Sequence, residues 1–156
     1  MPTEHYEDIS LHQTHRLGPF VLTEKDILDF AGQWDPLPLH VDPEFAKTTD
    51  KGHVIASGFQ LLAVCQKLMV ERKPMAIVVG LGLDEVRFMT SGMPGDHLFL
   101  EIEAIAKRES KSRPHAGIVT HSFRLVNQHG EVILTYNGTG IIKKRHAASG
   151  AGAIRP

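Results

Sequence analysis

The stretch from Ile55 to Val70 restricts the possible folds of this chain more than any other part of it. Read as a helix, it is apolar on nearly every face, and only Gln60, Gln66 and Lys67 are clearly polar. A helix of this kind is stable when other elements surround it. Because the run is too short to cross a membrane, the rest of the chain must supply its cover.

The second half of the chain provides that cover as β-strands. From Leu98 to Ala106, apolar residues alternate with polar ones, which is the period of a strand with one buried face. Similar strands are predicted at Met75 to Val79, Leu83 to Met89, Ala116 to Val126 and Val132 to Ile142, with a hairpin turn at Asn127 to Gly130. Helices followed by a meander of strands indicate the α+β class. The economical packing wraps one curved antiparallel sheet around the apolar helix.

The first half begins with a short predicted strand from Leu17 to Leu22, and a helix should follow it. Thr23 and Asp26 have the spacing of a helix start, where side-chain oxygens satisfy free amides. Apolar residues then recur on one face as far as Trp34. The segment from Asp35 to His40 ends this helix, because its two prolines lack amide donors and favour extended backbone. We therefore expect this segment to be stiff and irregular.

The length of 156 residues suits one domain, which we expect to span residues 17–145. Residues 1–16 are polar and residues 146–156 are rich in Ala and Gly, so both ends are expected to be poorly ordered. A formal net charge of -1 gives no general attraction to nucleic acid or to an anionic membrane. The single cysteine, Cys65, excludes an internal disulfide, and the first residues lack the pattern of a secretory signal. A cytoplasmic location is predicted from these two features.

Asp35 and His40 are the most suggestive catalytic pair. Pro36 and Pro38 between them stiffen the backbone beside a helix end, and rigidly held loops commonly carry sites. Addition of water to a polarised double bond needs one group to take a proton from water and another to give a proton to carbon, and a carboxylate and an imidazole can share these roles. The structural alternative makes Asp35 a turn residue and His40 a surface residue. The residues alone leave both interpretations open.

The start of the apolar helix is a second candidate. Free amides and the positive end of the helix dipole favour anions there, and Gly58 would let a carbonyl group approach the backbone closely. Ser57 is equally well explained as a plain N-cap, and both roles can hold together. Gln66 lies two turns further along a helix built for burial, so it needs a hydrogen-bond partner. Asp35 is one candidate partner, and a backbone group in the core is the other.

No metal site is predicted, although the chain has ten histidines. His5, His12 and His15 fall in the polar first segment, and neither an HExxH motif nor a paired Cys/His spacing occurs. The basic run from Lys143 to His146 is too short to indicate nucleic-acid binding, and such runs more often end a strand in solvent.

Taken together, these segments resemble the MaoC-like dehydratases, a hot-dog-fold family that includes the (R)-specific enoyl-CoA hydratases. The resemblance covers roughly residues 17–144. It rests on residues 30–46, where Asp and His five apart correspond to the family's catalytic dyad, and on Ile55 to Gly58, Val86 to Phe88 and Pro94 to Asp96. One departure is Leu37, since hydratases commonly carry Asn or another polar amide two residues after the Asp.

The resemblance implies reversible addition of water to a trans-2-enoyl-CoA, or to the same acyl group on an acyl-carrier protein, to give a 3-hydroxyacyl thioester. Asp35 and His40 would then be catalytic, and Ser57, Gly58 and Gln66 would bind substrate, with the Gly58 amide in the oxyanion hole. No metal or redox cofactor is implied, since coenzyme A or the pantetheine arm arrives as part of the substrate. A homodimer is implied, and the basic run that begins at Lys143 could meet the phosphates of coenzyme A.

Two other functions fit the same fold. A hot-dog thioesterase would direct water at the thioester carbonyl, and the release of free thiol would identify it. A catalytically silent acyl-CoA-binding subunit is made plausible by Leu37, and it would bind acyl-CoA without turnover.

Overall fold

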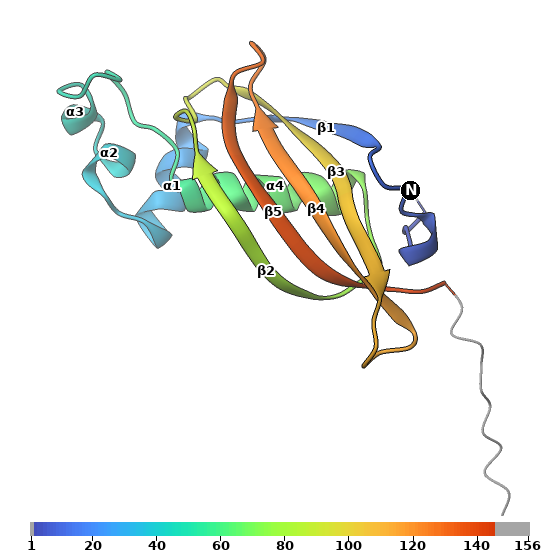
Figure 1. The fold of residues 1–156 in the computed structure, drawn as a ribbon. Coiled ribbons are helices and arrows are strands. Elements are labelled where there is room, and N and C mark those ends of the chain that lie inside the picture. The colour runs from blue at the N-terminus through green and yellow to red at the C-terminus, as the bar shows by residue number, and fades with distance from the viewer. Residues whose placement is uncertain (1, 146–156) are drawn as a thin grey trace, which may run out of the picture.

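A five-stranded antiparallel sheet curves around one long helix in the computed structural model, which describes residues 2–145 (Figure 1). The strand order is β1-β3-β4-β5-β2. The strands are β1 (Thr14–Val21), β2 (Ile77–Phe88), β3 (His97–Glu109), β4 (Ala116–Val126) and β5 (Val132–Lys143). The helices are the 3-10 turn η1 (Tyr6–Asp8), α1 (Glu24–Trp34), α2 (Pro38–Val41), α3 (Pro43–Ala46) and α4 (Gly58–Arg72). The predicted α+β hot-dog fold is confirmed.

Helix α4 is the apolar helix predicted from the sequence. Ser57 caps its first turn by accepting a hydrogen bond from the Phe59 amide. The sheet covers one side of this helix, whereas Phe59 and Val70 on the other side are 66% and 52% exposed. The hydrophobic character on that second side is therefore not explained by burial within this chain. Among residues 2–145, no helix combines the length and the apolar character needed to span a bilayer.

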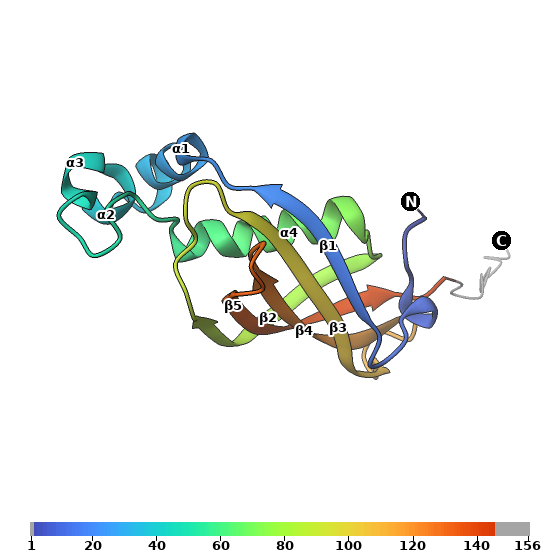
Figure 2. The same ribbon diagram turned by 90° about the horizontal axis from the view of Figure 1, so that it is seen from above.

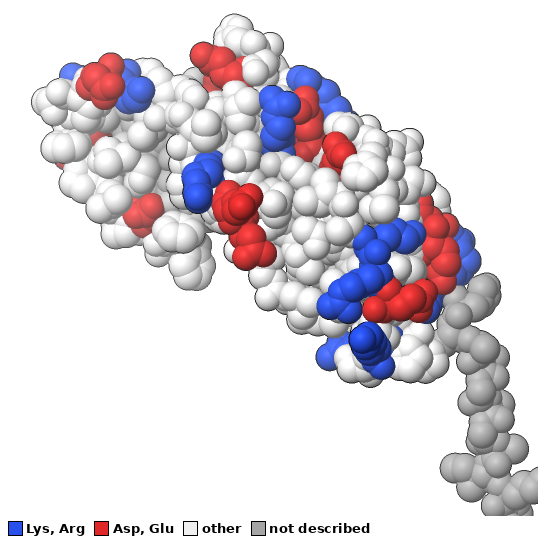
Figure 3. Space-filling model, viewed as in Figure 1, with Lys and Arg blue, Asp and Glu red and all other residues white. Residues whose placement is uncertain are grey.

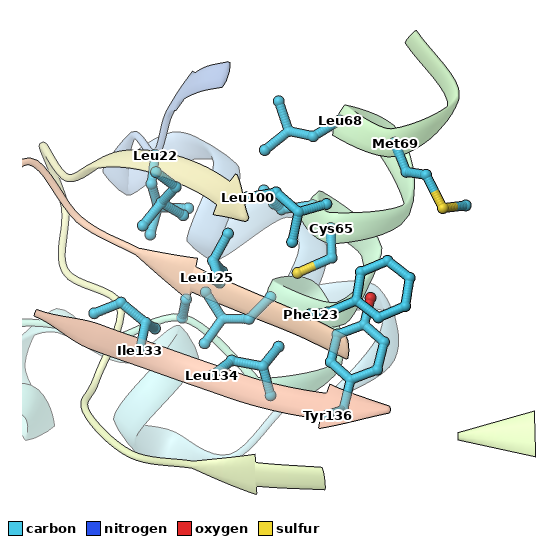
Figure 4. Close-up of a cluster of buried hydrophobic side chains, with 14 of the residues drawn as sticks. Leu22, Cys65, Leu68, Met69, Leu100, Phe123, Leu125, Ile133, Leu134 and Tyr136 are labelled. Atoms are coloured by element: carbon cyan, nitrogen blue, oxygen red, sulfur yellow. The ribbon is translucent and has the colours of Figure 1, made fainter. Parts of the chain in front are cut away.

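The main core lies between α4 and the inner face of the sheet (Figure 4). Leucine, isoleucine and valine side chains fill most of it, and many are completely buried. Phe123 of β4 and Tyr136 of β5 stack with ring centroids 4.5 Å apart beside Cys65 of α4. Burial raises the pKa of the Cys65 thiol to about 12, so this cysteine is a structural thiol.

The short helices α1, α2 and α3 gather beyond the N-terminal end of α4 (Figure 2). Thr23 and Asp26 form the predicted reciprocal cap of α1, which ends at Trp34 as predicted. The expected irregular segment is instead partly helical, because Pro38 starts the one-turn helix α2. Proline is well tolerated as a first helical residue, since its missing amide would have had no partner there.

Strand β2 differs from prediction in being continuous. Two strands separated by Gly80-Leu81-Gly82 were expected, but pairing with β5 runs through this region, with Gly80 opposite Gly140. The register shifts between Gly80 and Gly82. Glycine accommodates such irregularities without ending a strand, so the glycines mark a bulge where the sequence indicated a break.

The expectation of a poorly ordered N-terminal segment is wrong for residues 2–16. Glu4 bridges to Met75, Leu11 bridges to Ala104, and the side chain of Tyr6 is buried. Tyr6 fits because it packs on Gly117, where an added Cβ would lie 2.1 Å from the ring. A polar segment can therefore dock through one aromatic residue and backbone pairing. The predicted flexible tail, residues 146–156, lies outside the described residues.

Candidate active site

Asp35 and His40 meet at the junction of α1 and α2. Asp35 is the C-cap of α1, and the turn that starts α2 brings His40 back towards it. His40 Nε2 lies 3.5 Å from Asp35 Oδ2, and the two side chains are only 8% and 19% exposed. The structure thus brings together the pair singled out from the sequence.

A backbone carbonyl sets the orientation of the His40 ring. His40 Nδ1 lies 2.6 Å from the carbonyl oxygen of Ile55, and a carbonyl can only accept, so Nδ1 carries the proton. In the neutral imidazole, Nε2 therefore presents its lone pair towards Asp35. Two acceptors 3.5 Å apart do not bond each other, but a water molecule could donate one hydrogen to each. The geometry suits a pair that holds and deprotonates water.

Ser57 fixes the carboxylate of this pair. Its hydroxyl donates to Asp35 Oδ2 at 2.7 Å and accepts from the Phe59 amide at 3.2 Å. The residue is completely buried. The structure therefore favours a positioning role for the Ser57 side chain over the predicted direct contact with substrate.

Gly58 opens onto the cavity beside this pair. The cavity has a volume of about 550 Å³ and is lined by Asp35, Gly58, Phe88 and neighbouring residues. As the first residue of α4, Gly58 has an amide without an intrahelical acceptor. A Cβ at this position would lie 2.6 Å from the Phe88 ring. Glycine thus leaves a free amide at the cavity wall, where it can stabilise an oxyanion.

Gln66 was expected to be buried and to bond either Asp35 or a backbone group in the core, but its side chain is exposed. Ser57 already holds Asp35, while Gln66 is exposed and lines a second cavity further along α4. The buried glutamine of this helix is Gln60, whose side-chain amide donates to the Asp26 carbonyl at 2.9 Å. Sequence reasoning could not distinguish the two, because both interrupt the same apolar helix. Leu37, which stands where the resemblance led us to expect a polar amide, is 51% exposed.

The basic run at the end of β5 lies away from the candidate site. Lys144 pairs with Glu109, and Arg145 pairs with Asp8. Figure 1 places this end of β5 at the opposite end of the molecule from α2, and Figure 3 shows basic and acidic side chains interleaved at that end. A role for this run in binding coenzyme A at the cavity is therefore not supported. His146 lies outside the described residues.

Two features of the site were missed from the sequence. Lys51 lines the cavity from the loop before α4, although nothing in its sequence context distinguishes it from other surface lysines. The Ile55 carbonyl that orients His40 belongs to the backbone, so no residue type signals it. Within residues 2–145, no three His, Cys, Asp or Glu side chains are grouped so that they could hold a metal ion.

Comparison with known proteins places the chain among relatives of one kind. A family model described as "MaoC like domain" matches residues 9–125. The uncharacterized protein YdeM of Bacillus subtilis is 30% identical over 124 residues, which cover 78% of this chain and 86% of YdeM. The (R)-specific enoyl-CoA hydratase of Aeromonas caviae is 31% identical over 106 residues, which cover 68% of this chain and 73% of that protein. The crystal structure of a MaoC-like dehydratase from Rhodospirillum rubrum matches with a TM-score of 0.82 at 29% identity, covering 92% of this chain and 99% of that one.

Proposed function

The chain belongs to the MaoC-like dehydratase family, and we propose on that premise that it adds water reversibly to a trans-2-enoyl thioester to give a 3-hydroxyacyl thioester. The observation that carries this proposal is the Asp35 and His40 pair. Its two acceptor atoms lie 3.5 Å apart, so a water molecule beside them could donate to both, next to a cavity with a free helix-start amide. Similarity to an (R)-specific enoyl-CoA hydratase supports the same reaction.

In the proposed reaction, the thioester carbonyl accepts a hydrogen bond from the Gly58 amide. Asp35 and His40 Nε2 hold the water molecule, and the pair removes a proton as the water oxygen bonds to C3 of the double bond. Negative charge then develops on the thioester oxygen, where the Gly58 amide and the N-terminal end of α4 stabilise it. The pair returns a proton to C2, which completes the addition of water. These residues supply acid, base and oxyanion donor, so the proposal requires no metal or redox cofactor.

Coenzyme A or an acyl-carrier pantetheine would enter with the substrate into the cavity that Lys51 lines. A lysine ammonium there suits the phosphate groups of either carrier. Gln66 would contact the acyl chain further along α4, where it lines the second cavity. We also propose that the chain acts as a homodimer, because β2 exposes apolar side chains along the edge of the sheet.

The test follows the loss of the conjugated thioester absorbance with purified protein and trans-2-enoyl-CoAs of several lengths. Asp35→Asn and His40→Ala should each lower turnover at least ~10²-fold, the low end for general acid–base catalysis. The double variant should be hardly slower than either single variant, because the two residues act as one unit.

Asp29→Asn is the matched control, since Asp29 is an exposed carboxylate on the same helix that pairs only with Lys25 among the described residues. It should retain wild-type turnover. If both dyad variants keep more than about a tenth of the wild-type rate while folded, the pair is not the acid–base unit. Release of free thiol without hydration would identify a thioesterase, and binding of acyl-CoA without either reaction would identify a silent acyl-binding subunit.

A further inference from the structure

A second cavity, of about 410 Å³, lies beside the C-terminal half of α4. Four glycines border it, Gly80 and Gly82 of β2 and Gly138 and Gly140 of β5. An added Cβ at Gly80 or Gly82 would meet no atom within 4 Å, so these two positions face open space. The bulge in β2 therefore shapes the wall of the second cavity as well as shifting the pairing with β5.

Both cavities border α4. Gly58 borders the first and Gln66 borders the second, a little over two helical turns further along, so the two positions lie about 80° apart around the helix. The distance between them along the helix axis is about 12 Å. An extended alkyl chain advances roughly 1.3 Å per carbon, given C–C bonds of ~1.5 Å, so an acyl chain of about ten carbons would reach from the thioester to the second cavity.

The lining of the second cavity includes a buried polar group without a partner in the described part of the chain. His121 of β4 is only 5% exposed, and its buried Nε2 has no hydrogen-bond partner in the described part of the chain. Buried polar atoms in native proteins nearly always have a partner, so this atom calls for one. The His121 ring borders both the second cavity and a small polar cavity that Glu4 and Lys73 line.

The surroundings of His121 favour a neutral partner. Lys73 and Glu4 form an ion pair with each other, so neither offers an unpaired charge to a ligand. Burial, and after it the Lys73 ammonium, lowers the pKa of His121 to about 4, which leaves the imidazole neutral near pH 7. A neutral imidazole donates at one nitrogen and accepts at the other, so it can bind a hydroxyl or a keto oxygen. A charged carboxylate would lose its solvation without gaining an unpaired cation.

We propose that the second cavity receives the far end of the acyl chain and that His121 selects chains carrying a hydroxyl or keto oxygen there. This inference rests on the proposed function for the identity of the acyl thioester. It narrows the substrate class from enoyl thioesters in general to medium-length chains with a neutral polar group near the end remote from the thioester.

The test measures binding with saturated ligands, which cannot be hydrated, so that the result does not depend on turnover. Isothermal titration calorimetry compares butyryl-CoA, decanoyl-CoA and 10-hydroxydecanoyl-CoA. We expect decanoyl-CoA to bind more tightly than butyryl-CoA, and the hydroxylated chain to bind about fivefold more tightly than decanoyl-CoA, which is the effect of one modest hydrogen bond. His121→Phe keeps a ring of similar shape and should abolish the preference for the hydroxyl.

His97→Phe is the matched control, because His97 is exposed at the start of β3 and borders neither cavity. It should keep the preference. Gly82→Val fills the second cavity and should remove the advantage of decanoyl-CoA over butyryl-CoA, which tests chain placement even if His121→Phe fails to fold. Equal binding of the two ten-carbon ligands to the wild-type protein would overturn the role of His121, and equal binding of butyryl-CoA and decanoyl-CoA would overturn the placement of the chain. Hydration of crotonyl-CoA, assayed in parallel, tests the proposed function separately, so either idea can fail alone.

Discussion

At the scale of single residues, the two members of the dyad are held by different kinds of partner. The Ser57 hydroxyl holds Asp35, and the Ile55 carbonyl holds His40. Both partners belong to the segment that leads into α4. The short stretch before one helix therefore orients the acid–base pair and also presents the Gly58 amide to the cavity.

Gly58→Ala tests whether the open backbone at this position matters for catalysis. The new methyl group would collide with the Phe88 ring, but this ring is more than half exposed and can turn away. We expect the free energy of unfolding to change by no more than about 1 kcal/mol, since alanine is a good helix residue. Turnover should fall at least about tenfold, because the methyl group blocks the approach of the thioester to the amide.

The measurements are steady-state hydration and urea unfolding of the same preparation. Gly32→Ala in α1 is the control, since an added Cβ there meets nothing within 4 Å. It should leave turnover unchanged. A Gly58→Ala protein with more than half of the wild-type turnover would contradict the oxyanion role.

His121 should make the stability of the protein depend on pH. Its pKa is about 4 in the folded chain, against an ordinary value of 6.5. As the pH falls below about 6.5, the unfolded chain binds a proton here and the folded chain does not, so the stability present above pH 6.5 is lost towards pH 4. Between pH 7 and pH 5 this group should account for about 2 kcal/mol of the loss.

Urea unfolding of wild type and His121→Phe at both pH values measures this share. The variant should lose about 2 kcal/mol less than wild type between pH 7 and pH 5. The exposed histidine variant His97→Phe should behave as wild type. Equal losses in His121→Phe and wild type would mean that His121 titrates normally in the folded chain.

At the scale of elements, one side of α4 packs on the sheet to form the main core. Leu68 is 2% exposed and packs in the core between α4 and the sheet (Figure 4). Leu68→Ala should lower the free energy of unfolding by about 2–5 kcal/mol, as large-to-small core changes do. Val70→Ala on the exposed side of the same helix should cost less than about 1 kcal/mol. Denaturant titrations that gave similar losses for both variants would show that the helix is not packed on the sheet as described.

The sequence predicted elements well where a single period or cap decided them. The cap at Thr23, the helix around Leu68 and the alternating strand β3 all follow from local pattern. Prediction failed where long-range pairing decided the outcome. Gly80 and Gly82 interrupt no strand because β5 pairs across them, and Tyr6 is ordered because Gly117, far along the chain, leaves space for its ring.

In the candidate site, too, local features were predictable and contacts between distant segments were not. Asp35 and His40 were predictable because both lie within one short segment, and Gly58 because it starts a recognisable helix. The contact of Ser57 with Asp35 was not predicted, since it joins two segments that only the fold brings together. Gln66 was expected to be buried but is exposed, because the helix pattern did not show which side of α4 the sheet covers.

At the scale of the whole molecule, β2 is an unusual edge. It is the last strand of the sheet, pairs only with β5 among the described residues, and exposes Ile77, Val78, Val79, Leu81 and Leu83. A long apolar edge of this kind invites pairing with another strand. We expect two copies to join along β2.

Light scattering after gel filtration should therefore give the mass of a dimer. Val79→Lys together with Leu81→Lys should shift the protein towards monomer, because paired lysines would meet across the joint. Thr14→Lys on β1, the opposite edge of the sheet, should leave the dimer intact. A wild-type monomer at micromolar concentration would contradict the proposed assembly.

The order of strands in the sheet also governs how the chain can fold while it is being made. β1 can pair only after β3 has been synthesised, since Thr14 lies opposite Glu103. In the same way, β2 can pair only after β5, which ends at Lys143. Each edge strand therefore pairs with a strand that leaves the ribosome later, and contacts this distant in sequence form slowly. A nascent chain that stops before Val132 has synthesised α4 and β2 but not the strand that pairs with β2. Newly made molecules thus keep α4 and β2 incompletely covered until nearly the whole chain has emerged.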